Sequence, residues 1–410
     1  MNNKGVTMKV KIEAYDHLGR GIAKIDGKVV FVPYTKKGET VEIEIVEQKK
    51  NYAVGKLLPL PSDTPSFCPY YGKCGGCQLQ HLSYEEQLEY KQELVKNQLE
   101  RYASIKLEEL PPIMATKSKA YRNKVTLHIE GNQLGFYQNK THRLFPITTC
   151  PILDPAIEKL IPVIKTFIET NRGLNQAVMR VLDRKIMLCL KGKADEAVII
   201  NYFSTYVDSL YYNNRLIAGV RSLETTIFGK RFMVAGDAFF QVNDLGMRKI
   251  YQQVIDWIPK EQEQVILDLY CGTGTMTLLL AEVAKQVIGV EINEQAIMSA
   301  RENAHINKVD NVIFYAGSTA AILPLITTPL DFVVVDPPRA GLDEVTCSQL
   351  LEFLPKKIIY VSCNPLTLAR DLQMLAEQYQ LEDIKLVDEF PETYHVECCA
   401  LLSLRKTKIS

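Results

Sequence analysis

The stretch VILDLYCGTGT at residues 265–275 decides the fold of this chain. Its first half is an apolar run typical of a buried strand, and Gly272 and Gly274 then allow the backbone to turn tightly and approach a ligand closely. A helical pattern follows at 276–284. A strand, a glycine-rich turn and a helix in this order predict the first unit of a parallel α/β sheet that binds a ligand at the carboxyl ends of its strands.

The same turn indicates which kind of ligand fits. Thr277 occupies the place of the third glycine of the dinucleotide pattern, so a ligand without phosphates fits better than a pyrophosphate. Glu291 ends the next strand, where a carboxylate can accept hydrogen bonds from both hydroxyls of a ribose. S-adenosylmethionine is such a nucleoside without phosphates. The alternative for Glu291 is a solvated charge at a strand end.

The strand–helix rhythm continues from about residue 245 to the end of the chain. Helical and strand patterns alternate here, which predicts a doubly wound parallel sheet. The tail at 384–388 and 398–404 suits a closing β-hairpin. The expected elements after the first strand are a helix at 276–284, a strand at 287–290, a helix at 294–306, and strands at 312–315, 332–335 and 358–361.

Two further motifs at strand ends concern the chemistry. Asp336-Pro337-Pro338-Arg339 has an arginine where methyltransferases acting on exocyclic amines commonly have an aromatic ring, which argues against an amine target. A carbon target such as C5 of uracil is a poor nucleophile until a group adds to C6, and a thiolate suits that task. Cys363 follows the apolar run 357–361 and is a candidate, although a lone cysteine is more often a small core residue.

Taken together, these motifs resemble the uracil-C5 RNA methyltransferases over essentially the whole chain. The resemblance rests on residues 239–243, 269–274, 336–341, 362–365 and 395–397. It implies a Rossmann-like class I methyltransferase domain, with Cys363 as the nucleophile and Glu397 as the base. In addition to the two glycines, it implies cofactor contacts for Gln241, Tyr270, Glu291, Ser318 and Asp336.

The part before the methyltransferase domain divides into two units. Residues 8–58 alternate with period two around a hairpin signal at Asp26-Gly27, and they resemble the TRAM domain, an oligonucleotide-binding-type β-barrel of RNA-modifying enzymes. A barrel with a purely structural role is the alternative. A helix is expected at 84–102, a second at 156–170, and a hairpin across Asp183-Arg184. The expected domains are 1–59 for the barrel, 60–235 for a central α+β domain, and 236–410 for the methyltransferase domain.

Four cysteines form a candidate metal site. Cys68, Cys74 and Cys77 share one glycine-bent loop, and Cys150 is the candidate fourth ligand. Four thiolates suit zinc and an iron–sulfur cluster equally well, so the spacing leaves the choice open. The resemblance implies a [4Fe–4S] cluster in the central domain, because the ribosomal-RNA branch of the family has this cysteine pattern.

Composition limits the setting in which the protein acts. The chain has 410 residues, 47% of them hydrophobic, and a net charge of zero. There is no signal-peptide pattern and no apolar stretch of about 20 residues, so we expect a cytoplasmic monomer without a membrane partner. Residues 1–60 and 101–143 are locally basic and suit contacts to RNA phosphates, although solvated loop charge explains them equally well.

These observations predict an S-adenosylmethionine-dependent enzyme that forms 5-methyluridine in 23S ribosomal RNA. One alternative is the same reaction on a transfer-RNA uridine. Another is a catalytically idle RNA-binding protein that acts as a chaperone. Cys363 and Glu397 argue against idleness, because a binding protein needs neither.

Overall fold

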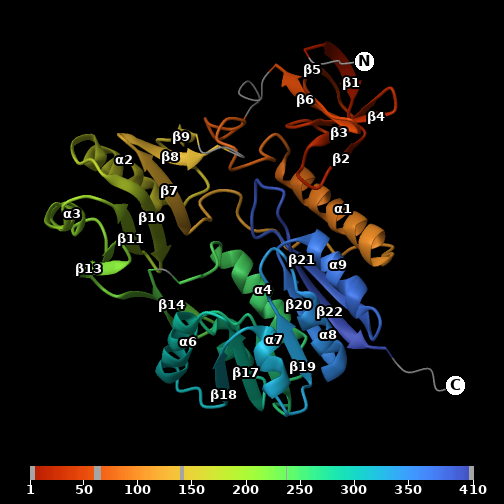
Figure 1. The fold of residues 1–410 in the computed structure, drawn as a ribbon, viewed down its shortest axis with the longest axis vertical. Helices are drawn as coiled ribbons and strands as arrows, with labels where there is room; N and C mark the ends of the chain where they lie inside the picture. The colour runs from red at the N-terminus through yellow and green to blue at the C-terminus, as the bar shows by residue number, and fades with distance from the viewer. Residues whose placement is uncertain (1–4, 60–65, 139–142, 237, 406–410) are drawn as a thin grey trace.

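The N-terminal unit is a six-stranded sheet with its own core. A computed structural model describes residues 5–59, 66–138, 143–236 and 238–405 of the chain (Figure 1). The strands pair in the order β1-β5-β6-β4-β3-β2. Their bounds are β1 Thr7–Lys11, β2 Ala14–Tyr15, β3 Gly21–Ile25, β4 Lys28–Val32, β5 Thr40–Gln48 and β6 Tyr52–Leu58. The hairpin expected across Asp26-Gly27 is confirmed as β3–β4.

The sequence patterns did not reveal β6. Its buried positions are the small residues Ala53 and Gly55, which give a weak hydrophobic alternation. Gly55 is required by packing, because a Cβ at this position would lie 2.7 Å from the Cδ1 atom of Ile43. The expected linker at 59–65 lies almost wholly outside the described residues.

Helix α1 (Tyr84–Ala103) confirms the helix expected at 84–102 and packs on the C-terminal domain. It begins with a capping box, in which the Ser83 side chain accepts from the Glu86 N–H and the Glu86 carboxylate accepts from the Ser83 N–H. Its buried face meets α9 (Pro365–Leu375) through Val95 and Leu99. Helix α1 is therefore attached to the domain that contains Cys363, although the helix and Cys363 are far apart in the sequence.

The central unit is a second mixed sheet covered by helices (Figure 1). Its strands pair in the order β13-β12-β11-β10-β7-β8-β9. The hairpin of β10 (Leu174–Leu182) and β11 (Lys185–Gly192) confirms the turn expected at Asp183-Arg184. The other elements are β7 Lys124–Glu130, β8 Gln133–Tyr137, β9 Leu144–Pro146, α2 Pro155–Thr170, α3 Glu196–Phe203, β12 Ser209–Tyr212 and β13 Arg215–Gly219.

The C-terminal unit is the doubly wound sheet that the sequence predicts. Its order is β18-β17-β16-β19-β20-β22-β21, parallel except for β22, which pairs antiparallel with both neighbours. The strands are β16 Val265–Leu269, β17 Gln286–Glu291, β18 Val312–Ala316, β19 Phe332–Val335, β20 Lys357–Ser362, β21 Tyr379–Val387 and β22 Glu397–Leu404. The expected terminal hairpin is thus confirmed as β21–β22.

Alternate residues of these strands enter two separate cores. Ile266 and Val334 face the layer of α4 (Asp244–Asp256), α5 (Thr275–Leu280) and α6 (Glu294–Ile306). Leu267 and Val333 face the layer of α1, α7 (Thr319–Ile322), α8 (Glu344–Phe353) and α9. Helix α5 ends four residues earlier than expected. The hairpin of β14 (Ser222–Ile227) and β15 (Lys230–Ala235) packs on α6.

Candidate functional site

Cys363 and Glu397 are brought together by strand pairing. Cys363 directly follows β20, and Asn364 caps α9 by accepting from the Leu366 N–H. In the antiparallel pairing of β20 with β22, Ser362 is opposite Cys398. The next pair outward is therefore Cys363 and Glu397, which is the first residue of β22. The two predicted catalytic side chains thus share one edge of the sheet, at the carboxyl ends of the parallel strands.

Burial disfavours the charged form of both groups in the free protein. Burial raises the pKa of the Cys363 thiol to about 11, and the Glu397 carboxylate adds to this rise. Burial likewise raises the pKa of Glu397 to about 8, with a further contribution from Asp336. The Arg339 guanidinium acts against the rise at both groups, because a positive charge favours both anions. A cationic ligand in the neighbouring pocket would act in the same direction.

Arg339 is held beside this pair by the loop that contains Cys363. Its carbonyl oxygen accepts from Asn364 Nδ2 at 3.0 Å and from Thr367 Oγ1 at 3.3 Å. Its Nη2 lies 3.4 Å from Nε2 of His395, whose pKa is lowered to about 3 by burial and then by Arg339. Sequence reasoning used Arg339 only to exclude an amine target. The signal that it belongs to the site was its position directly after the Asp-Pro-Pro motif.

A small pocket of about 60 Å³ lies next to the pair. Four of the predicted cofactor residues line it, namely Gln241, Tyr270, Gly272 and Asp336. Gly272 has a φ of +54°, and a Cβ built on it would have no atom within 4 Å, so its backbone faces open space. The other lining residues are Phe239, Phe240, Ile250, Tyr251, Asp268, Cys271, Thr273, Thr275, Met276, Val334 and Val361.

The remaining predicted cofactor residues are placed differently. Glu291 lies beside the pocket, where its carboxylate accepts from the Gly272 N–H at 3.2 Å and from the Asn293 N–H at 2.9 Å. Gly274 does not line the pocket, and a Cβ there would lie 2.9 Å from Ala300. Ser318 does not line it either, because it caps α7 through its hydroxyl. Gly274 therefore serves helix packing, and two backbone N–H groups hold the Glu291 carboxylate in place.

Two buried carboxyl groups, those of Asp268 and Asp336, line the pocket. Burial raises the pKa of Asp336 to about 7 and that of Asp268 to about 7, although the Thr277 hydroxyl donates to Asp268 at 2.5 Å. Such groups are stabilised as anions when a positive charge enters the pocket. The pocket is thus electrostatically suited to a cationic nucleoside.

Glu389 is a buried acid that sequence reasoning missed. Neither of its carboxylate oxygens has a hydrogen-bond partner among the described residues. Burial, and then the nearby Glu397, raises its pKa well above the ordinary value. Its Oε2 fills the space that a side chain at Gly246 would need. No pattern around residue 389 signals this position, because the neighbours Gly246 and Glu397 are distant in sequence.

The four predicted metal-ligating cysteines lie near one another. Burial raises the pKa of Cys150 to about 12, and the nearby Cys68 and Cys74 add to this rise. The pKa of Cys77 is raised even more strongly, by burial and then by Cys150. All four are free thiols. In the described part of the chain, however, no group of three or more His, Cys, Asp or Glu side chains could hold a metal ion as it stands.

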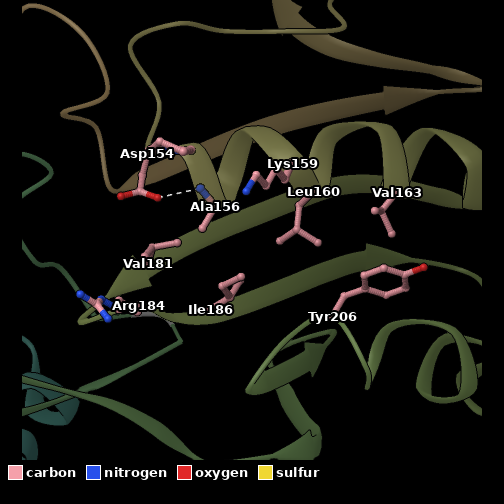
Figure 2. A pocket seen from close by; sticks show the side chains of 10 residues that line it. Asp154, Ala156, Lys159, Leu160, Val163, Val181, Arg184, Ile186 and Tyr206 are labelled. Carbon is pink, nitrogen blue, oxygen red and sulfur yellow. Dashed lines mark hydrogen bonds between the residues drawn. The ribbon is translucent and has the colours of Figure 1, made fainter.

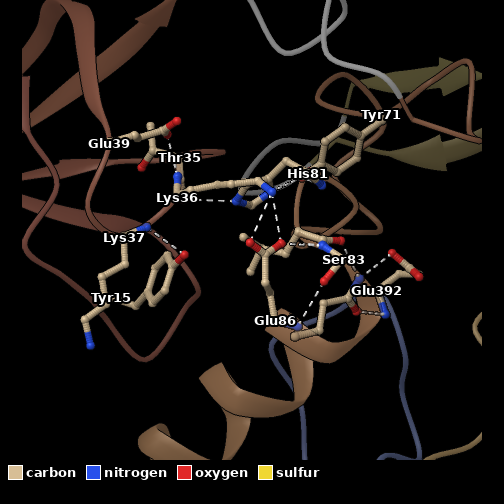
Figure 3. A network of polar contacts seen from close by, with 12 residues as sticks. Tyr15, Thr35, Lys36, Lys37, Glu39, Tyr71, His81, Ser83, Glu86 and Glu392 are labelled. Atoms are coloured by element: carbon tan, nitrogen blue, oxygen red, sulfur yellow. Dashed lines mark hydrogen bonds and ion pairs between the residues drawn. The ribbon is translucent and has the colours of Figure 1, made fainter.

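The cysteine loop also joins the N-terminal barrel to the rest of the molecule (Figure 3). The His81 Nε2 lies 3.1 Å from the carbonyl oxygen of Thr35, and its Nδ1 lies 2.6 Å from the Tyr71 hydroxyl. Lys36 pairs with Glu86 of α1 at 2.9 Å beside it. On the other side, the Gln78 and Leu79 N–H groups donate to the carbonyl oxygen of Glu392. The barrel is therefore fixed relative to the segment that leads to Glu397.

Comparison with family models gives two matches. The model described as tRNA (Uracil-5-)-methyltransferase matches residues 221–322 and 323–405. The TRAM domain model matches residues 2–58. Across the described residues, no helix has the length and apolar character that a membrane crossing requires.

Relatives and a solved structure cover nearly the whole chain. An uncharacterized RNA methyltransferase of Halalkalibacterium halodurans is 33% identical over 98% of this chain and 98% of its own. One from Staphylococcus aureus is 34% identical over 95% of this chain and 96% of its own. The crystal structure of Pyrococcus abyssi tRNA (uracil-54, C5)-methyltransferase with S-adenosyl-L-homocysteine is similar, with a TM-score of 0.78 and 29% identity over 96% of this chain and 100% of that one.

Proposed function

The chain belongs to the family of S-adenosylmethionine-dependent RNA uracil-5-methyltransferases with a TRAM domain, and on this basis we propose that it methylates C5 of a uridine in 23S ribosomal RNA. The observation that supports the chemistry most directly is the cross-strand position of Cys363 and Glu397 beside a pocket lined by Asp336 and Gly272. A nucleophile and a base at one edge of the sheet are what this reaction requires.

In the proposed reaction, the Cys363 thiol loses its proton to solvent, and the thiolate adds to C6 of a uracil that has been flipped out of its stack. The electron pair of the C5–C6 bond moves to C5, which becomes nucleophilic. S-adenosylmethionine supplies the methyl group and leaves as S-adenosylhomocysteine. Glu397 then takes the proton from C5, the C5–C6 double bond forms again, and the bond between C6 and sulfur breaks.

The residues around the pocket fit the proposed cofactor. Glu291 holds its carboxylate at the end of β17, where it can accept from ribose hydroxyls, and the open backbone at Gly272 leaves room for the nucleoside. The cationic sulfonium would lower the pKa of Cys363, and Arg339 acts in the same direction. Phe239, whose side chain is 72% exposed at the pocket, is suited to stack on the target base.

We further propose that Cys68, Cys74, Cys77 and Cys150 bind a [4Fe–4S] cluster. Such a cluster attaches each thiolate to a different iron atom, so the thiols need not converge on a single ion. Burial raises the pKa of all four thiols, neighbouring cysteines add to the rise at Cys74, Cys77 and Cys150, and bound iron would favour the thiolates. Anaerobically purified protein is expected to contain about four iron atoms and four sulfides. Stoichiometric zinc without iron would overturn this assignment.

Ribosomal RNA is proposed over transfer RNA because the cysteine pattern is the one that the family's ribosomal-RNA branch has. The similarity to a tRNA methyltransferase favours the alternative. Mapping 5-methyluridine in total RNA from cells with and without the protein separates the two. The expected loss is in 23S ribosomal RNA. A loss confined to transfer RNA would reject the ribosomal target and leave the chemistry intact.

A further inference from the structure

A second pocket lies in the central domain, away from the cofactor pocket (Figure 2). It has a volume of about 430 Å³ and lies between α2 and the β10–β11 hairpin. Figure 2 shows Leu160 and Val163 of the helix facing Val181 and Ile186 of the hairpin. Its other lining residues are Asp154, Pro155, Ala156, Lys159, Arg184 and Tyr206.

The rim of this pocket combines positive charge with an aromatic ring. Lys159 and Arg184 are exposed, and neither forms a salt bridge with a carboxylate of the described residues. Tyr206, at the opposite end of the pocket from Arg184, has 47% of its surface exposed (Figure 2). An apolar floor with unpaired cations and an exposed ring has the chemistry that binds a single unstacked base together with its phosphates.

The pocket is directly connected to the catalytic site. The Asp154 N–H donates to the carbonyl oxygen of Arg122 at 2.9 Å. Arg122 bridges to Asn243 in the segment that lines the cofactor pocket, and its charge contributes to the lowered pKa of His395. His395 contacts Arg339, beside Cys363. The backbone of Arg122 thus links the start of α2 to the segment of the cofactor pocket, and the charges of Arg122 and Arg339 near His395 favour a polyanion.

We propose that this pocket binds a second unstacked nucleotide of the RNA substrate, so that the enzyme holds its RNA at two flipped bases. The base lies on Leu160 and Ile186 and against Tyr206, while Lys159 and Arg184 contact the adjoining phosphates. Asp154, which caps α2 through one carboxylate oxygen, faces the base edge, where it can accept from an exocyclic amine. The proposal deepens the proposed function and rests on it.

The test uses the full-length protein and unmodified RNA from cells that lack it. Tyr206→Ala and the pair Lys159→Ala/Arg184→Ala are each expected to weaken RNA binding about tenfold, because stacking and phosphate contacts are each lost. Tyr206→Phe keeps the ring and is expected to bind like the unaltered protein. The pair Lys165→Ala/Lys185→Ala removes the same charge from the same helix and hairpin outside the pocket, and serves as the matched control.

Three outcomes overturn the proposal. If Tyr206→Ala binds normally while the lysine–arginine pair does not, the site contacts phosphate only. If the control pair weakens binding as much as the pocket pair, the effect is that of net charge. If the unaltered protein neither binds nor methylates the RNA, the proposed function itself fails. Unchanged S-adenosylmethionine binding in every variant shows that a loss of RNA binding is not a loss of fold.

Discussion

At the scale of the residue, burial disfavours the charged forms of Cys363 and Glu397 that the proposed reaction requires. The thiol has a pKa of about 11, and the carboxyl has a pKa of about 8, because burial disfavours both anions. The activation must therefore come from positive charge, which Arg339 supplies in the free protein and a sulfonium would supply in the complex. We therefore expect the Cys363 thiol to become more acidic when a cationic cofactor is bound.

Two substitutions are expected to separate the roles of this pair. Cys363→Ala should abolish both methylation and the covalent RNA adduct, because no other group can add to C6. Glu397→Gln should slow turnover about 10²–10⁴-fold and accumulate a methylated adduct, since only elimination needs the base. Denaturing gels would show the adduct as a shifted band.

Cys398→Ala removes the adjacent buried thiol and should still form the adduct, which makes it the control for Cys363→Ala. Methylation that persists in Cys363→Ala would exclude this cysteine as the nucleophile.

The raised pKa of Glu397 sets the expected pH profile. The base is neutral below a pH of about 8 and charged above it, so kcat, which includes the elimination step, should rise with pH through this region. Arg339→Gln removes the positive charge that lowers the pKa of Cys363 and of Glu397. The increase in rate should therefore move to higher pH by about one unit. Lys356→Gln removes a distant surface cation and should leave the profile in place. A profile of Arg339→Gln that does not move would show that Arg339 has no electrostatic role.

At the scale of the element, helix α1 is joined to the C-terminal segment by a fully buried ion pair. The Lys91 Nζ lies 2.5 Å from Asp388 Oδ1, and both side chains have no exposed surface. Lys91 also donates to the carbonyl oxygen of Phe390 at 3.1 Å. These contacts hold the segment between β21 and β22 in place. This segment leads directly into Glu397, the first residue of β22.

Removing one partner of this ion pair should lower the free energy of unfolding much more than replacing both partners. Lys91→Met is expected to lower the free energy of unfolding by about 3–5 kcal/mol, because Asp388 would remain buried and unpaired. The double variant Lys91→Met/Asp388→Asn should recover a large part of the loss. Lys96→Met, on the exposed face of the same helix, should change stability little. Denaturant unfolding measures all three, and a loss of similar size for Lys96→Met would contradict the ion-pair account.

At the scale of the whole molecule, the barrel has its own core but is held in a fixed position. Val10, Val30 and Ile43 belong to a cluster drawn from residues of the barrel alone. The attachment is polar through Thr35, Lys36 and His81 (Figure 3). It is also aromatic, because Tyr15 and Tyr34 of the barrel contact Tyr90 and Tyr71. The barrel can therefore be removed without opening the methyltransferase core, and its contribution to RNA binding can be measured separately.

Deletion of residues 1–58 is expected to weaken RNA binding and leave S-adenosylmethionine binding intact. The affinity of the shortened protein should also fall less steeply with salt, because fewer phosphates are contacted. Binding titrations over a range of salt concentrations measure both effects. Unchanged RNA affinity would indicate that the barrel is structural, and lost cofactor binding would indicate that its removal damages the fold.

The sequence by itself determined the local elements, because hydrophobic periodicity and glycine turns act over a few residues. It predicted the strands around Gly272, the hairpin at Asp183-Arg184 and helix α1. It also singled out Cys363 and Glu397 as candidates for the nucleophile and the base, and these roles stay predictions. Strand β6 was not predicted, because its buried positions are the small residues Ala53 and Gly55, which packing requires and which give no clear hydrophobic alternation.

Only the tertiary structure decided which of these residues meet. Cys363 faces Glu397 because β22 enters the sheet antiparallel, between β20 and β21. Arg339, His395 and Arg122 approach one another from segments with no shared periodicity. Such contacts depend on strand order and on the packing of distant elements. They leave no repeating signal in the chain, so neither the meeting of Arg339 with His395 nor the second pocket could be predicted from sequence.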